Sequence, residues 1–197
     1  IQSTFIEAAA ADTDGISTAA AVGEDASLVI GGALASGGAV TFDQPRNITI
    51  LSAGDDSGIS FTVTGTDETA TSATESITGA NAGTATGSAY FATITAITAV
   101  GDPAGNVSAG SGTSIAAPMY RGRMRLRGIY VVNTGTAGTT TFSQTSSSGA
   151  VAMKFNTVAS ANTTQYPDIP DDGILFAAGG YVLYTQTALS SITVFYS

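Results

Sequence analysis

Short runs in which large apolar residues alternate with small polar ones constrain this chain more than any other feature. In residues 59–64 (ISFTVT), Ile, Phe and Val alternate with Ser and Thr. Successive side chains of a strand point to opposite faces, so this period of two predicts a strand with one buried face. Similar runs occur at residues 46–52, 73–78 and 88–100. No stretch after residue 40 shows a convincing helical period, and the chain is therefore predicted to be all-β.

The last third of the chain continues this pattern with shorter runs. Gly, Ser, Asn and Pro separate them, as expected for turns. They lie at residues 121–133, 139–144, 150–156, 173–176, 181–185 and 191–196. Short strands at this spacing are typical of β-sandwiches and jelly rolls. Within 88–100, Ile94 and Ile97 have opposite parity, which predicts a β-bulge or burial on both faces of that strand.

These observations predict two small antiparallel β-sandwich or jelly-roll-like domains, at residues 39–107 and 119–197. Residues 108–118 (SAGSGTSIAAP) are rich in Gly, Ser and Ala and are predicted to be a linker. Residues 1–38 are predicted to form an extended N-terminal arm, in which residues 5–11 (FIEAAAA) favour a short helix if any forms. Much of the apolar content is Ala, so each core should be thin and the protein is expected to self-associate as a trimer.

The chain has no Cys, no His and no Trp. Their absence excludes thiolate nucleophiles, imidazole bases, disulfides and the usual zinc, haem and iron–sulfur ligands. No catalytic residues and no cofactor are predicted, and the chain is not expected to be an enzyme. Six basic residues against fifteen acidic ones give a net charge of −9, which opposes nucleic acid and anionic membranes as partners. No run of 18 apolar residues exists, and the first fifteen residues lack a signal-peptide pattern.

Four of the six basic residues lie at alternate positions of one short segment, as Arg121, Arg123, Arg125 and Arg127. On a strand they would share one face, about 6.6–6.8 Å apart. Since the remaining chain carries −13, this arginine strip is predicted to contact protein, either a second copy or another particle component. The Asp171-Asp172 turn of a neighbouring copy is one available complement. Two alternatives stay open: charge protection of an edge strand with intrachain salt bridges, and phosphate binding.

Acidic residues elsewhere occur in Gly-containing turns, which favours ordinary turn chemistry. Such turns contain Asp12 and Asp14, Asp55 and Asp56, Asp67 and Glu68, and Asp168, Asp171 and Asp172. Calcium at the last of these and a glycosidase-like carboxylate pair are the minor alternatives, and no metal site is predicted. The C-terminal aromatics Tyr181, Tyr184, Phe195 and Tyr196 are predicted to pack in the core. Only Tyr120 and Tyr166 lie where a loop could present an aromatic ring to a sugar.

Three segments, at residues 48–79, 125–133 and 173–197, resemble segments of structural proteins from tailed bacteriophages of the marine and cyanophage kind. The resemblance rests on the order of turn residues and strand-like runs along these segments, not on a chemical motif. The stretches that carry it are ITILSAGDDSGISFTVTG, RLRGIYVVN and GILFAAGGYVLYTQTALSSITVFYS. It implies a virion component on the particle exterior, either a head decoration (cement) protein bound to the major capsid protein or a tail, adaptor or fibre-attachment subunit. A carbohydrate-binding module for a host surface is the remaining alternative.

Overall fold

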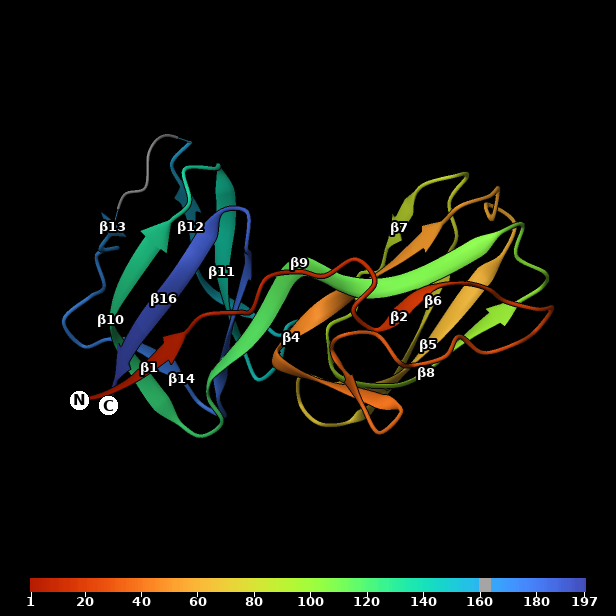
Figure 1. Ribbon diagram of the computed structural model, residues 1–197. Helices are drawn as coiled ribbons and strands as arrows, with labels where there is room; N and C mark the ends of the chain where they lie inside the picture. The colour runs from red at the N-terminus through yellow and green to blue at the C-terminus, as the bar shows by residue number, and fades with distance from the viewer. Residues whose placement is uncertain (160–163) are drawn as a thin grey trace. The chain divides into compact units, whose positions relative to one another are not determined.

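The computed structural model describes residues 1–159 and 164–197, and these residues form strands, turns and loops with no helix (Figure 1). Every strand pair in the described residues is antiparallel, which confirms the all-β prediction. The short helix expected within residues 5–11 does not form. Strand β1 (Gln2–Ile6) instead pairs with β16 (Leu189–Tyr196), and this pairing buries Ile6. Tertiary pairing thus overrides the local helix propensity of the Ala run.

The chain divides into two compact units whose boundaries differ from the expected domains. Unit 1 comprises residues 1–10 and 113–197, and unit 2 comprises residues 11–112. The expected N-terminal arm is therefore shared between the units rather than separate. Residues 11–38 belong to unit 2, where Ile16 and Leu28 are buried in its core.

The expected linker 108–118 is instead part of strand β9 (Asn106–Tyr120), and most of its residues are buried. Its small residues permit close packing: a Cβ on Gly110 would lie 2.2 Å from the carbonyl oxygen of Asp12. A Cβ on Gly112 would lie 2.3 Å from the Asn47 side chain. Glycine here serves the close approach of other chain segments, a role that composition cannot distinguish from flexibility.

Unit 1 is built from strands of two sheets around one apolar core. One sheet has the order β1-β16-β10-β13, and β14 also pairs with β10. The other runs β12-β11-β15 and continues onto the C-terminal part of β9. The bounds of the strands not yet given are β10 (Met124–Asn133), β11 (Gly138–Gln144), β12 (Val151–Thr157), β13 (Thr164–Gln165), β14 (Ile174–Phe176) and β15 (Gly180–Thr185). Side chains from both sheets, among them Phe142, Phe176 and Val194, form the core.

Unit 2 is built around the strand order β9-β4-β8-β5-β6, in which β9 takes part through its N-terminal residues only. Short strands complete it: β2 pairs with β9, while β3 and β7 pair with β4. Their bounds are β2 (Ser17–Ala21), β3 (Ala35–Ser36), β4 (Ala39–Ser52), β5 (Ser60–Asp67), β6 (Ser72–Thr78), β7 (Thr84–Thr86) and β8 (Phe91–Val100). Phe61, Ile94 and Ile97 are fully buried in its core. A register shift in the β5–β8 pairing confirms the bulge that the spacing of Ile94 and Ile97 predicted.

Candidate interaction surface

The four arginines do not share one strand face, because β10 begins only at Met124. Arg125 and Arg127 lie on this strand, as predicted, whereas Arg121 and Arg123 precede it. Residues 121–123 connect β9, in one sheet of unit 1, to β10, in the other. Strand pairing cannot continue through such a change of sheet. The prediction of a continuous four-arginine strand is therefore wrong in its first half, although the alternation that suggested it extends through both halves.

Arg125 and Arg127 hold a turn of their own unit. Nη1 of Arg125 donates to the carbonyl of Asp172 at 3.0 Å, and Nη1 of Arg127 donates to the carbonyl of Asp171 at 2.7 Å. Nε of Arg127 also donates to the Ser197 hydroxyl at 3.0 Å. The turn that was expected as a complement on a neighbouring copy thus contacts arginines of the same chain, and it does so through main-chain oxygens.

Strand β10 is an interior strand of its sheet. It pairs with β16 along one edge and with β13 and β14 along the other. Edge protection by charge needs a strand with one unpaired edge. That alternative explanation of the arginine strip is wrong for this strand.

Arg121 and Arg123 are both exposed, and we call residues 121–123 the arginine turn. The neighbouring Tyr120 side chain is 42% exposed, and its ring centroid lies 5.2 Å from that of Tyr196. A Cβ on Gly122 would lie 2.8 Å from the Tyr120 ring, so the ring packs closely over this glycine. The turn therefore carries two exposed arginines next to an aromatic residue of the chain. Arg and Tyr are the residue types that protein interfaces favour.

The most buried cation of the described residues, Arg46, was not among the predicted site residues. It is 1% exposed, and its Nη2 lies 2.5 Å from Oδ1 of Asp43. Its guanidinium carbon lies 5.5 Å from the centroid of the Phe42 ring. The three-residue spacing of Asp43 and Arg46 was the available signal. Because Arg46 faces the interior of unit 2, it stabilises the fold and does not present a charge to a partner.

Asp55 and Asp67 show the predicted turn chemistry, whereas Asp56 and Glu68, in the same two turns, are buried. Oδ1 of Asp67 accepts hydrogen bonds from the amides of Thr69 and Thr71, at 2.8 and 2.9 Å. Oδ1 of Asp55 accepts from the amide and hydroxyl of Ser57, at 3.2 and 2.7 Å, and these hydrogen bonds lower the pKa of Asp55. Within residues 1–159 and 164–197, no group of three or more His, Cys, Asp or Glu side chains could hold a metal ion.

Two acidic side chains of unit 2, Asp56 and Glu68, are buried, and a third, Glu75, is partly buried. Asp56 is fully buried, and its Oδ1 accepts from the Ala104 amide at 2.7 Å. Oε1 of Glu75 accepts from the Ser88 amide at 2.6 Å. Glu68 is 5% exposed; burial and, to a lesser degree, the charge of Glu68 raise the pKa of Tyr90. The carboxylates of Asp56 and Glu75 thus fasten loops within unit 2.

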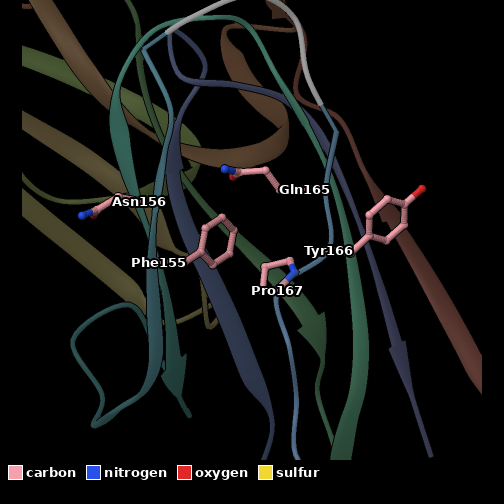
Figure 2. Close-up of a pocket in the computed structure, with 5 residues that line it drawn as sticks. All are labelled: Phe155, Asn156, Gln165, Tyr166 and Pro167. Carbon is pink, nitrogen blue, oxygen red and sulfur yellow. The ribbon is translucent and has the colours of Figure 1, made fainter.

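A pocket of about 360 Å³ lies in unit 1 (Figure 2). Its lining consists of Phe155, Asn156, Gln165, Tyr166 and Pro167. Figure 2 shows Phe155 and Pro167 facing each other, while the Tyr166 ring turns away. Oε1 of Gln165 is buried without a hydrogen-bond partner among the described residues. The pocket thus combines an apolar wall with an amide oxygen able to accept a hydrogen bond.

The aromatic predictions are confirmed for Tyr181, Tyr184 and Tyr196, whose side chains are buried. Phe195 differs, with 38% exposure, because it points to the opposite face of β16 from the buried Val194 and Tyr196. Tyr166 is 72% exposed. It packs against Tyr130, with 5.1 Å between their ring centroids, so it forms part of an aromatic pair.

Comparisons of the chain with protein-family models, curated proteins and solved structures give no match. Among the described residues, no helix has the length and apolar character needed to cross a membrane.

Proposed function

We propose that this chain is a non-enzymatic structural protein of a tailed-bacteriophage particle, and in particular a decoration (cement) protein that binds and stabilises the exterior of the head. The observation that carries the proposal is the exposed pair Arg121 and Arg123, on a chain whose other charged residues are predominantly acidic. Such a pair suits a contact with carboxylates of another protein. The resemblance of three segments to phage structural proteins, and a residue content without His or Cys, also support it.

The proposed partners are other copies of this chain, as a trimer, and the major capsid protein or another virion protein. Nucleic acid and membrane are not proposed as partners, because the net charge of −9 opposes approach to either polyanionic surface. Each unit is proposed to be a small β-sandwich. In unit 1, this is supported by a core that draws on strands of two sheets, while the jelly-roll connectivity stays a prediction.

Copy number in purified particles tests this proposal. Quantitative mass spectrometry should find hundreds of copies per particle for a decoration protein, whereas a tail, adaptor or fibre-attachment subunit should give roughly 6–18. Absence of the chain from the particle overturns both readings.

The contact itself is tested with Arg121→Glu combined with Arg123→Glu, in the arginine turn. Arg125 and Arg127 are left unchanged because they also hold the turn at Asp171 and Asp172. We expect this variant to fold but to lose attachment to particles that lack the wild-type protein. Normal attachment of the variant contradicts a role for the arginine turn.

The pocket in unit 1 favours a second candidate function, carbohydrate binding to a host surface. The lining combines aromatic residues (Phe155 and the exposed Tyr166) with amide side chains (Asn156 and Gln165), and these residue types suit stacking on sugars and hydrogen bonding to their hydroxyls. A glycan array separates this reading from the first. Binding that is abolished by Tyr166→Ala would favour it, and absence of binding would exclude it for the glycans displayed.

A further inference from the structure

Charge is divided unequally between the two units. Unit 2 contains eleven of the fifteen acidic residues and one of the six basic residues, which gives it a net charge of −10. Unit 1 contains the other four acidic and five basic residues, for a net charge of +1. The single basic residue of unit 2, Arg46, is buried beside Asp43. The surface of unit 2 therefore offers carboxylates with almost no neutralising cation.

The exposed carboxylates of unit 2 concentrate at one end of that unit. Two turns there are joined by hydrogen bonds, from the Asp25 amide to the Gly101 carbonyl (3.0 Å) and from the Gly101 amide to Oδ1 of Asp25 (2.8 Å). A third turn is joined to them by the hydrogen bond between Ala104 and the buried Asp56. These three turns carry the exposed side chains of Glu24, Asp25, Asp55 and Asp102, which we call the acidic end.

The acidic end holds most of the exposed negative charge of unit 2. Only two other acidic residues of this unit, Asp14 and Asp43, are exposed, and Asp43 pairs with Arg46. The hydrogen bonds between the turns hold together the main chain that carries these four side chains, and the carboxylates of Asp25 and Asp55 also accept hydrogen bonds themselves. A preorganised charge cluster loses less entropy on binding than one on a flexible segment.

We propose that the arginine turn of one copy of this chain docks on the acidic end of unit 2 of a second copy. The inference rests on the proposed function, since it identifies the protein surface that the arginine turn contacts. Charge complementarity selects the second copy: the turn presents Arg121 and Arg123, and the chain itself supplies a matching cluster of four carboxylates. A polyanion such as DNA would have to approach a unit with a net charge of −10.

A contact between two different surfaces can be made head-to-tail along a series of copies, or reciprocally by two copies about a twofold axis. Pairing two arginine turns, or two acidic ends, about a twofold axis would place like charges together. Head-to-tail contacts generate closed rings when the rotation closes, and the proposed trimer is one such ring. Exposed ion pairs are individually weak and are screened by salt, so the association is expected to weaken strongly as salt rises.

Sedimentation analysis of the full chain at low salt tests this with charge-matched single variants. Arg123→Glu and Asp102→Arg should each lower the association constant at least tenfold. Their controls change the net charge by the same amount elsewhere on the same unit: Lys154→Glu on β12 in unit 1 and Asp14→Arg in unit 2, both exposed. The controls should stay within about twofold of wild type. Neither Arg123 nor Asp102 has a hydrogen bond within the described residues, so the folds should be retained.

Mixing the two interface variants gives the sharpest result. In an equimolar mixture, Glu at position 123 of one variant can meet Arg at position 102 of the other, so mixed complexes should form more strongly than either variant alone self-associates. If Asp102→Arg behaves like Asp14→Arg, the acidic end is not the complement and the inference is overturned. A wild-type chain that stays monomeric at low salt also overturns it. In both cases, loss of particle attachment by the Arg121→Glu, Arg123→Glu variant would still support the proposed function. If this variant keeps both self-association and particle attachment, the inference and the proposed role of the arginine turn are overturned together.

Discussion

Nη1 of Arg127 donates a 2.7 Å hydrogen bond to the main-chain carbonyl of Asp171, which lies 44 residues further along the chain. Arg125 makes the corresponding contact with Asp172. Gly173 follows at φ +69°, a left-handed conformation that favours glycine, and β14 begins at the next residue. The evenly spaced arginines thus divide into two pairs: Arg125 and Arg127 lie on β10 and hold the Asp171–Gly173 turn, while Arg121 and Arg123 lie in the arginine turn that precedes this strand.

Replacing Arg127 with Ala should loosen the Asp171–Gly173 turn without unfolding unit 1. The change removes two hydrogen bonds at an exposed site, so the expected loss of stability is about 1 kcal/mol. Hydrogen exchange should accelerate at the amides of residues 171–176. Arg123→Ala is the control, and equal acceleration in both variants would show that the hydrogen bonds of Arg127 do not hold the turn.

Asp43→Asn should destabilise unit 2, because it leaves the buried guanidinium of Arg46 without its charged partner. Breaking a buried ion pair typically costs 3–5 kcal/mol. Since the Asp43 side chain is 40% exposed, we expect about 2 kcal/mol. Urea unfolding should show a lower midpoint with an unchanged slope. Asp14→Asn removes an exposed carboxylate of the same unit and should leave the midpoint unchanged.

Gly110→Ala should destabilise the fold by about 1–3 kcal/mol, because the added Cβ would overlap the main chain at Asp12. Gly58→Ala is the matched control, since its Cβ would meet no atom within 4 Å. Thermal unfolding of the two variants measures the difference. If both behave like wild type, the segment predicted as a linker tolerates the extra atom and is not closely packed.

The pKa of Tyr90 lies above its ordinary value of 10.0, chiefly because the side chain is withdrawn from water and secondarily because of the Glu68 charge. The folded protein therefore keeps the phenol proton to higher pH than the unfolded chain does. The resulting stability is fully present below pH 10.0 and is lost as pH rises through the raised pKa. Urea unfolding at a series of pH values should show that Tyr90→Phe flattens the fall in unfolding free energy above about pH 10. An equally steep fall in the variant would contradict this assignment.

Local alternation was sufficient to predict most of the strands. The run at 59–64 lies largely within β5, where Phe61 and Val63 are fully buried, and the later runs overlap β10, β11, β12, β14, β15 and β16. The opposite parity of Ile94 and Ile97 predicted the irregular pairing of β8. These features depend on neighbouring residues only, because the side-chain period of a strand is a local property.

The candidate site was predictable in composition but not in arrangement. Four arginines at alternate positions marked the segment, yet the local pattern could not show that the chain changes sheets at residues 121–123. It also could not show that Arg125 and Arg127 meet the Asp171-Asp172 turn, since that contact depends on where β14 docks. The burial of Arg46 could not be predicted from neighbouring residues, because it comes from long-range packing in unit 2.

The sequence by itself determined the all-β class, the approximate strand positions, the turn chemistry of acidic residues such as Asp55 and Asp67, and the excess of negative charge. The tertiary structure decided which strands pair, how the N-terminal residues divide between the units, and whether residues 108–118 are loose or packed. Small residues such as Gly110 allow either outcome. Residues 108–118 form a packed strand because a distant segment, the main chain at Asp12, lies close against Gly110.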